Sequence, residues 1–575
     1  MQNLLPLQIL AQSLKPSRGD IMKINGSQIL IECLVEQGVD TVFGYPGGQA
    51  LNIYDALYKN SDRIRHILTA HEQGASHAAD GYARATGKVG VCIATSGPGA
   101  TNLVTGIATA YMDSVPMVAI TGQVPNALIG KDSFQEVDIT GITMCITKHN
   151  YIVKDVKDLA ATLREAFYIA QSGRPGPVLV DIPKDVTAAI CEYEYQMPKM
   201  ITPQVETICD KDIQVLADLM KSASKPMIYS GGGVIASGAH KEVLALAEKL
   251  EAPVATSLMG LGSFPETHPL ATGLVGMHGS VASNLGFTKC DLLIALGARF
   301  SDRVISDVSK FAPNATIVHV DVDPAEIGKN VPVEASVVGD VKEVLSKLLP
   351  LIPKQEHPEW LKDVQKWKDS FKYNYQDGEK LRPQFMLRNI DEQTEGKAII
   401  TTEVGQHQIW AAQFFNYTKP RTFISSGGLG TMGYGTGASI GAQIAMPEKQ
   451  VVHIAGDGSF RMNCNELSTI AHYDIPVIIV VVNNTTLGMV RQWQTAFYEK
   501  RYSQTTLDRG PDFKKLAEAY GIKGYDVHTQ EDFQNAFGEA LESGKPAVLN
   551  CFIDMDERVL PMVAPGAAID NIIVD

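Results

Sequence analysis

The chain has 575 residues, a length that predicts about three or four domains. Hydrophobic residues make up 45% and charged residues 20% of the sequence, which excludes a disordered, collagen-like or disulfide-framework protein. The formal net charge of −14 disfavours nucleic-acid binding, because an acidic surface repels phosphate backbones. The eight cysteines are scattered without metal-ligand spacing, so we expect reduced thiols and a cytoplasmic protein.

The first 22 residues lack the basic and apolar blocks of a secretory signal and are loosely organised, so they are predicted to be a disordered extension or an artefact of start-site choice. Two long uncharged stretches, 89–112 and 422–447, contain glycines and polar residues that a membrane-spanning helix would avoid. We therefore expect a soluble protein.

Short apolar, β-branched runs alternate with helical stretches, which predicts an α/β fold of doubly wound parallel sheets. Most runs are apolar on both faces, as expected when helices cover both sides of a sheet. Several end in Gly, Ser, Asp or Asn, and open α/β sheets bind ligands at those carboxyl ends. The predicted strands are Gly90–Ala94, Met117–Thr121, Val178–Asp181, Met227–Ser230, Leu292–Leu296, Thr316–Val320, Val451–Ala455 and Val477–Val482.

Two proline-containing linkers, at 193–207 and 350–383, divide the chain into predicted domains. The domains are residues 23–190, 191–360 and 361–575. In the first and third, a hydrophobic strand leads into a glycine-rich turn and then a helix, as in VCIATSGPGATN and VVHIAGDGSFRMN. The layout predicts two related α/β domains that flank a different middle one.

A glycine-rich turn in the third block predicts a metal and phosphate site. Asp457, between two glycines, follows one predicted strand, and Asn484 follows the next. Consecutive parallel strands usually lie close together, so we expect both side chains at one sheet edge. Their hard oxygens suit Mg²⁺ that also binds phosphate. A helix expected to begin after Phe460 would direct its amide dipoles at the anion.

The second candidate is Glu72, in the segment LTAHEQGASHAADGYAR. A single Glu between a strand and a helix is often a capping or surface residue. Here the neighbours are small or apolar, and a desolvated carboxylate has a raised pKa that lets it exchange a proton with a ring nitrogen near neutral pH. We interpret Glu72 as a general acid–base residue.

The GDG…NN spacing resembles the diphosphate-and-metal motif of thiamine diphosphate enzymes. The resemblance implies that Asp457, Asn484 and the Thr486 carbonyl bind Mg²⁺, that Glu72 contacts the aminopyrimidine, and that Met432 lies under the thiazolium. For His407, a hydrogen-bonded structural role is the alternative. The implied cofactor contacts are Glu72, Val404, Gly405, Gln406, His407, Gly430, Met432, Gly456, Asp457, Gly458, Ser459, Asn484 and Met489.

A longer series of motifs, from YPGG through GARFSDRV to GMVRQWQTAFYEKRYS, closely resembles the family of acetolactate synthase (acetohydroxyacid synthase) large subunits. The family decarboxylates pyruvate and joins the two-carbon unit to a second pyruvate or to 2-oxobutanoate, the first common step of branched-chain amino acid biosynthesis. The implied catalytic residues are Glu72, Gly48, Gln135, Lys184 and Arg303. The implied substrate pocket is Phe134, Gln135, Arg303 and Trp493.

The middle block has glycine-rich strand ends that, by the same resemblance, bind FAD in a non-redox, structural role. A glycine triplet alone is often only a turn, and His278 is as easily a structural turn histidine as a flavin contact. The implied FAD contacts are Arg174, Gly231, Gly232, Gly233, Thr256, Leu258, Met259, Gly276, Met277, His278, Gly297, Arg299, Asp321 and Asp340.

The resemblance also implies a homodimer or homotetramer with active sites between subunits, and a small regulatory subunit as partner. One alternative is a related thiamine enzyme, such as a pyruvate oxidase or a 2-keto acid decarboxylase, which the RFSDR and QWQ segments disfavour. A flavin-free catabolic acetolactate synthase is another, and the GMHG and GAR segments argue against it. A non-catalytic nucleotide-binding module would explain the glycines but not Glu72, nor Asp457 with Asn484.

Overall fold

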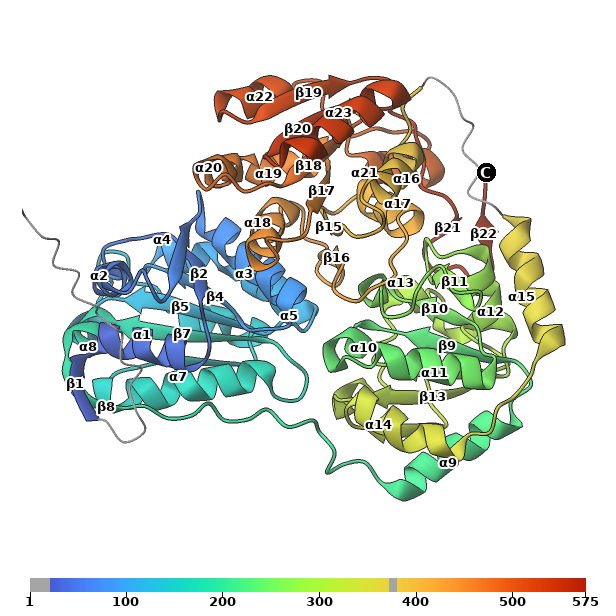
Figure 1. Cartoon of the computed structure of the whole chain (residues 1–575), viewed down its shortest axis with the longest axis horizontal. Helices are drawn as coiled ribbons and strands as arrows, with labels where there is room; N and C mark the ends of the chain where they lie inside the picture. The colour runs from blue at the N-terminus through green and yellow to red at the C-terminus, as the bar shows by residue number, and fades with distance from the viewer. Residues whose placement is uncertain (1–20, 372–379) are drawn as a thin grey trace, which may run out of the picture.

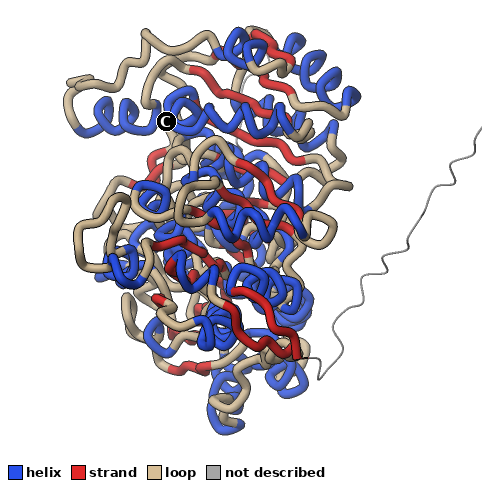
Figure 2. The backbone as a smooth tube through the Cα atoms, turned by 90° about the vertical axis from the view of Figure 1, so that its left-hand side faces the viewer, coloured by secondary structure: helices blue, strands red, loops and turns tan. Residues whose placement is uncertain are grey.

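A computed structural model describes residues 21–371 and 380–575, arranged as three six-stranded parallel sheets with helices on both faces (Figure 1). In Figure 2 the strands run through the interior and the helices lie outside them. This confirms the predicted α/β class. All eight predicted strands form, with ends that differ by at most two residues, because their apolar side chains are buried under helices.

The N-terminal sheet has the strand order β3-β2-β4-β5-β7-β6. Its strands are β2 (Thr41–Gly44), β3 (Arg65–Leu68), β4 (Gly90–Ala94), β5 (Met117–Gln123), β6 (His149–Ile152) and β7 (Pro177–Pro183). Its helices are α1 (Gly26–Glu36), α2 (Leu51–Lys59), α3 (Glu72–Thr86), α4 (Pro98–Asn102), α5 (Val104–Met112), α6 (Ile139–Thr143), α7 (Val156–Gln171) and α8 (Lys184–Ala188). An antiparallel pair, β1 (Ile21–Asn25) with β8 (Ile190–Glu194), joins the two ends of this unit.

The central sheet has the order β11-β10-β9-β12-β13-β14. Its strands are β9 (Pro226–Ser230), β10 (Val254–Thr256), β11 (Ala271–Leu274), β12 (Leu292–Leu296), β13 (Thr316–Asp321) and β14 (Ala335–Val338). Its helices are α9 (Asp210–Ser222), α10 (Gly232–Ser237), α11 (His240–Leu250), α12 (Val281–Lys289), α13 (Asp302–Ile305), α14 (Val341–Leu348) and α15 (Pro358–Ser370).

The C-terminal sheet has the order β16-β15-β17-β18-β20-β19. Its strands are β15 (Ile399–Thr402), β16 (Phe423–Ile424), β17 (Val451–Gly456), β18 (Ile478–Asn483), β19 (Lys523–Val527) and β20 (Ala547–Phe552). Its helices are α16 (Pro383–Gln393), α17 (Gln406–Phe414), α18 (Gly435–Ala445), α19 (Asp457–Asn463), α20 (Leu467–His472), α21 (Gly488–Phe497), α22 (Phe513–Ala519) and α23 (Gln530–Ser543). A short pair, β21 (Met562–Val563) with β22 (Ile572–Ile573), follows.

Numbered within each sheet, the two outer sheets share the order 2-1-3-4-6-5, whereas the central sheet has the order 3-2-1-4-5-6. The expected pair of related domains around a different middle one is therefore confirmed at the level of topology. The central order is that of dinucleotide-binding folds.

The two outer units share one hydrophobic core, because α3 and α18 cross at very close range (Figure 1). A Cβ on Gly81 would overlap the Ala438 carbonyl, and one on Gly441 would overlap the Ala78 carbonyl. Glycine is thus required at both positions for the helix backbones to touch.

The structure differs from the predicted boundaries in four places. The boundary at 190 cuts through β8, which pairs with β1 of the N-terminal unit. Residues 1–20 of the predicted extension lie outside the described residues, but Ile21 and Met22 belong to β1. Helix α15, split by the predicted boundary at 360, packs on the central unit, where Trp360 donates a hydrogen bond to the Pro226 carbonyl. The C-terminal segment also returns to that unit, since Asn284 donates to the Ile569 carbonyl.

Helix α19 begins at Asp457, earlier than the predicted start after Phe460. The glycine-rich turn around Asp457 therefore forms the first turn of the helix. Within the described residues, no helix has both the length and the apolar run that crossing a membrane requires.

Candidate active site

The carboxyl edge of the N-terminal sheet brings together four of the predicted catalytic residues. Gly48 follows β2 and Lys184 follows β7, and the Lys184 ammonium donates to the Gly48 carbonyl at 2.8 Å. Glu72 begins α3, and its carboxylate accepts a 2.9 Å hydrogen bond from the Asn102 amide. Gln135 packs on the turn after β4, where a Cβ on Gly97 would lie 2.8 Å from its carbonyl oxygen.

The backbone that carries Glu72 is held by a residue that the sequence did not reveal. Glu466, from the C-terminal unit, accepts hydrogen bonds from the backbone N–H groups of Ala70 and His71, both at 3.0 Å. The Thr469 hydroxyl also donates to it, at 2.6 Å. Burial raises the pKa of Glu466. No sequence pattern links it to Glu72, because the contact exists only when the two units pack together.

The loop with Phe134 and Gln135 is fixed at its base and open at its tip. The Gln123 amide donates to the Val137 carbonyl at 2.8 Å and to the Asp181 carboxyl at 2.9 Å. Burial raises the pKa of Asp181 to about 7. Phe134 is 85% exposed in the single chain. The predicted channel residue therefore has no wall opposite it within the described chain.

The carboxyl edge of the C-terminal sheet holds the predicted metal ligands. Gly456 at the end of β17 is in register with Val482 of β18, which places Asp457 beside Asn484. Burial raises the pKa of the Asp457 carboxyl to about 6, against the opposing effects of Arg461 and of the nearby backbone N–H groups of Gly458 and Asn484. The Asn484 amide oxygen accepts from the Thr486 N–H at 3.3 Å. The edge thus places Asp457, Asn484 and Thr486 close together in the chain's fold, and their binding of Mg²⁺ stays a prediction.

These ligands fit a magnesium ion better than a transition metal. Among residues 21–371 and 380–575, no group of three or more His, Cys, Asp and Glu side chains could hold a metal. One carboxylate with amide and carbonyl oxygens is instead the donor set typical of Mg²⁺ that also takes phosphate oxygens.

The segment 403–408 lies against this edge. The Gln406 amide oxygen accepts from the Asn484 amide at 3.3 Å, and its NH₂ donates to Gln492 at 2.9 Å. His407 is buried beside Gly456, its Nε2 has no hydrogen-bond partner, and burial lowers its pKa to about 3. An unpartnered buried nitrogen is unusual for a histidine with a purely structural role, and contact of His407 with the cofactor stays a prediction.

The glycine-rich loop 427–435 is anchored at its end by Glu403. This buried carboxylate accepts hydrogen bonds from the backbone N–H groups of Gly433 at 2.6 Å, Gly435 at 3.0 Å and Thr436 at 3.2 Å. The loop therefore reaches Met432 and α18 in a fixed conformation.

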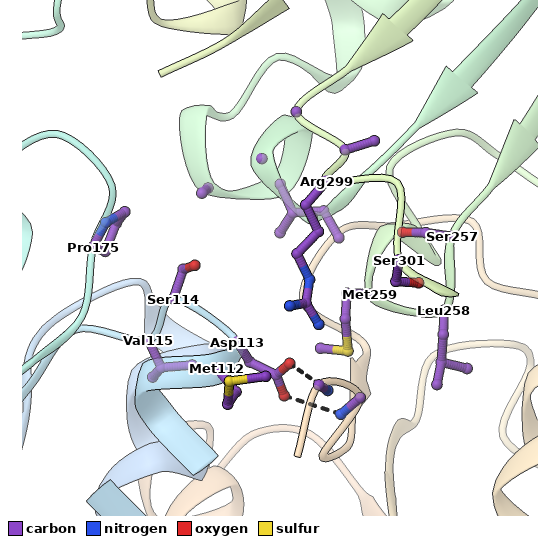
Figure 3. Close-up of a pocket in the computed structure, with 18 of the residues that line it drawn as sticks. Met112, Asp113, Ser114, Val115, Pro175, Ser257, Leu258, Met259, Arg299 and Ser301 are labelled. Carbon is purple, nitrogen blue, oxygen red and sulfur yellow. Dashed lines mark hydrogen bonds between the residues drawn. The ribbon is translucent and has the colours of Figure 1, made fainter. Parts of the chain in front are cut away.

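A cavity of about 950 Å³ lies where the three units meet (Figure 3). Most of the predicted FAD contacts line it, namely Arg174, Gly232, Gly233, Leu258, Met259, Met277, His278, Gly297, Arg299, Asp321 and Asp340. It is also lined by Arg303, Val404, Gly405, Gly430 and Met489, which were predicted for the substrate or the thiamine cofactor.

Gly231, Thr256 and Gly276 were also predicted to contact FAD, but they are not on the cavity wall. A Cβ on Gly231 would overlap the Gly297 carbonyl, and one on Gly276 the Arg303 carbonyl, so these glycines permit close packing behind the wall. Thr256 is buried at the end of β10.

Several wall residues already have protein partners. Arg174 pairs with Glu326 at 2.8 Å and Asp323 at 3.1 Å. The His278 Nδ1 lies 3.2 Å from the Pro561 carbonyl oxygen, and burial lowers the pKa of His278 to about 4. His278 therefore makes a hydrogen-bond contact typical of a structural turn histidine, and it also lines the cavity, so both interpretations of His278 stay predictions. Arg303 is 63% exposed.

Trp493, on α21, is not on this wall, and its ring meets Phe497 edge-on at 6.0 Å. The two sheet edges also remain separate: no hydrogen bond or ion pair in the described parts of the chain joins Glu72 to Asp457, and neither residue lines the cavity.

Comparison with known proteins gives full-length matches. Three family profiles match in order: the N-terminal TPP binding domain of thiamine pyrophosphate enzymes at 24–142, their central domain at 213–348 and their C-terminal TPP binding domain at 403–551. The chain is 49% identical over 565 residues to the probable acetolactate synthase large subunit of Methanocaldococcus jannaschii, covering 96% of this chain and 95% of that protein.

Two further relatives give the same picture. The acetolactate synthase large subunit of Corynebacterium glutamicum is 48% identical over 96% of this chain and 90% of its own length. That of Parasynechococcus marenigrum is 48% identical over 94% of this chain and 90% of its own length. With these matches and the two sheet edges described above, the chain belongs to the acetolactate synthase large subunit family of thiamine pyrophosphate enzymes.

Proposed function

We propose that this chain is the catalytic subunit of an acetolactate synthase. It decarboxylates pyruvate and transfers the two-carbon unit to a second pyruvate, giving 2-acetolactate, or to 2-oxobutanoate, giving 2-aceto-2-hydroxybutanoate. These products start branched-chain amino acid biosynthesis. The observation that carries the proposal is the Asp457–Asn484–Thr486 cradle at the carboxyl edge of one matched TPP domain, with Glu72 at the corresponding edge of the other.

The residues at the C-terminal edge fit thiamine diphosphate (thiamine pyrophosphate) with Mg²⁺. Asp457, Asn484 and the Thr486 carbonyl would hold the metal, and the unpartnered nitrogen of His407 would contact the cofactor. The N–H groups at the N-terminus of α19 would bind the diphosphate. When bound, thiamine diphosphate supplies a carbon nucleophile and an electron sink.

The remaining roles fall to residues of the N-terminal edge and the cavity. Glu72 holds and moves a proton at the aminopyrimidine ring, because a carboxyl group can serve as acid and base there. The Gly48 backbone stabilises negative charge that develops on substrate oxygen. Lys184 and Gln135 line the approach to it, and the fork of Arg303 binds the carboxylate of the second keto acid. Trp493 shapes the pocket for the extra methyl group of 2-oxobutanoate.

The cavity between the units fits FAD in a structural role. Its volume of about 950 Å³ is at the upper end of ligand pockets, and it lies at the carboxyl ends of a central sheet with dinucleotide-binding strand order. A Cβ on Gly232 would meet only Met259, at 3.4 Å, so the backbone there is accessible from the cavity, whereas Gly233 packs closely against Gly297. Joining two keto acids transfers no net electrons, so the flavin needs no redox role.

We further propose that Glu72 of one subunit completes the site that holds Asp457 in another, within a homodimer or homotetramer. The exposed apolar side chains around the N-terminal edge support this, since Leu51 is 54% and Phe134 85% exposed.

A small regulatory subunit is the further partner, and the cytoplasm is the expected location. The domains remain assigned to 23–190, 191–360 and 361–575, apart from the packing differences noted above.

The test is product analysis with the full-length protein, thiamine diphosphate, Mg²⁺ and FAD. We expect 2-acetolactate from pyruvate without oxygen uptake, and no product when thiamine diphosphate is omitted. Acetaldehyde as the main product would indicate a decarboxylase, and oxygen-dependent acetyl phosphate an oxidase; either outcome contradicts the proposal. Activity without flavin would indicate the flavin-free type.

A further inference from the structure

A buried carboxylate, Asp113, ties the glycine-rich loop of the C-terminal unit to helix α5 of the N-terminal unit (Figure 3). It accepts hydrogen bonds from the backbone N–H groups of Gly427 at 3.0 Å and Gly428 at 2.7 Å. Its side chain is 1% exposed. Two successive amides on one carboxylate fix the direction of the loop as well as its position.

The position of Asp113 is fixed in turn by a buried charge network. The Arg84 guanidinium donates to Asp113 at 2.9 Å and to Asp80 at 2.6 Å. The Tyr434 hydroxyl, just before α18, donates to Asp80 at 2.5 Å, and the guanidinium lies over its ring at 5.6 Å. These groups belong to both outer units, so the network fixes the position of the N-terminal unit relative to the C-terminal unit.

The loop packs closely against side chains of the cavity wall. A Cβ on Gly428 would lie 2.8 Å from both Arg299 and Asp113, and one on Gly427 would overlap the Met259 sulfur. A second tie to α5 comes from the hydroxyls of Thr109 and Thr431, which lie 2.8 Å apart.

The same loop faces two sites. Residues 427–430 form part of the cavity wall, and the next residues lead to Met432 and to the end held by Glu403. A change in the loop conformation therefore alters both the cavity wall and the segment that leads to Met432. A group that holds the loop in its binding conformation before any ligand arrives reduces the ordering that binding requires.

We propose that Asp113 is a positioning residue. It holds the glycine-rich loop 427–435 in its binding conformation between the flavin cavity and the thiamine diphosphate site. The inference rests on the proposed function, which assigns those two ligands. It predicts that, once Asp113 is lost, the loop is ordered by ligands instead, so that FAD in the cavity restores part of the lost thiamine diphosphate affinity.

The test is Asp113→Asn in the full-length protein, with cofactors removed by dialysis. Thiamine diphosphate with Mg²⁺ is titrated by calorimetry, with and without saturating FAD. The amide NH₂ replaces an acceptor that faces N–H donors, so we expect the dissociation constant without FAD to rise about tenfold. Saturating FAD should lower the dissociation constant for thiamine diphosphate in both proteins. The fold-decrease in Asp113→Asn should be at least about three times the fold-decrease in the wild-type protein.

The matched control is Asp291→Asn, because Asp291 also accepts two successive backbone amides, from Ser224 at 2.8 Å and Lys225 at 2.9 Å, and is not on the cavity wall. It should bind both ligands as the wild-type protein does. An unchanged dissociation constant in Asp113→Asn, or an increase that FAD does not reverse, overturns the inference. Failure of the wild-type protein to bind thiamine diphosphate or FAD overturns the proposed function instead.

If Asp113→Asn does not fold, Thr431→Val decides, since it removes the other tie between loop and α5. A smaller rise in the dissociation constant that FAD reverses supports the inference, and no change contradicts it.

Discussion

The two outer sheets share one strand order but differ at their carboxyl edges. At the N-terminal edge, Phe134 is 85% exposed and Gly48 has open space around its Cα. At the C-terminal edge, Asp457, Asn484 and His407 are all buried. One topology therefore supplies an open edge, suited to groups that act on a passing substrate, and a closed edge, suited to a tightly held cofactor. If this comparison is right, substitutions at the open edge change turnover and those at the closed edge change cofactor affinity.

The largest expected effect is that of Glu72→Gln. Without a group that moves a proton, kcat for acetolactate formation should fall about 10²- to 10⁴-fold, while calorimetry shows thiamine diphosphate still bound. Glu531→Gln, also in the first turn of a helix but exposed and remote, controls for the helix-dipole change and should keep full activity. Loss of cofactor binding with loss of turnover would break the comparison.

At the closed edge, Asp457→Asn should raise the half-saturating Mg²⁺ concentration about tenfold or more, because it removes the single carboxylate from the ligand set. The measurement is a Mg²⁺ titration of activity at saturating thiamine diphosphate. The exposed Asp363→Asn is the control. A lower kcat at an unchanged Mg²⁺ requirement would contradict the comparison, because Asp457 would then affect turnover, as expected for residues of the open edge.

Glu466 links the C-terminal unit to the backbone just before Glu72, so its loss sharpens the comparison. In Glu466→Gln an NH₂ group meets N–H donors of Ala70 and His71, and a lost hydrogen bond to a charged acceptor of about 1.5 kcal/mol corresponds to about a tenfold fall in kcat. Thiamine diphosphate affinity, measured by calorimetry, should remain within about twofold of the wild-type value. A fall in affinity with unchanged kcat would show that Glu466 does not act through Glu72.

The smallest effect concerns stability. Burial raises the pKa of Asp181 to about 7, so between about pH 4 and 7 the folded state holds a proton that the unfolded state has lost. This group therefore makes stability fall as pH rises through that range. In Asp181→Asn, which mimics the protonated carboxyl, the Tm difference between pH 5 and 7.5 should shrink by several degrees. Asp363→Asn should keep the wild-type difference, and an unchanged difference in Asp181→Asn contradicts the assignment.

Most of the fold could be predicted from sequence, because runs such as Leu292–Leu296 are apolar on both faces and read as buried parallel strands. The pairing of Asp457 with Asn484 could also be predicted, since both follow consecutive strands. The start of α19 was misplaced because the Asp-Gly pair reads as a turn, although here Asp457 opens the helix.

The contacts between units could not be predicted. Asp113 and Glu466 bind backbone amides far along the chain, and which amides they meet depends on how α3 packs on α18. Similarly, Gly231 and Gly276 are predicted to contact FAD, and the structure adds that a side chain at either position would overlap a neighbouring backbone carbonyl behind the wall. Local patterns identify strands and turns, but they do not show which of two close-approach partners, protein or ligand, a glycine accommodates.

The antiparallel pairing of β1 with β8 has a consequence for synthesis of the chain. Ile21 pairs with Glu194, so β1 leaves the ribosome about 170 residues before its partner. During that time its edge is unprotected, and the N-terminal unit can close only after Glu194 has been synthesised. A nascent chain arrested before Ile190 should therefore expose β1 to proteases, and one arrested well beyond Glu194 should protect it.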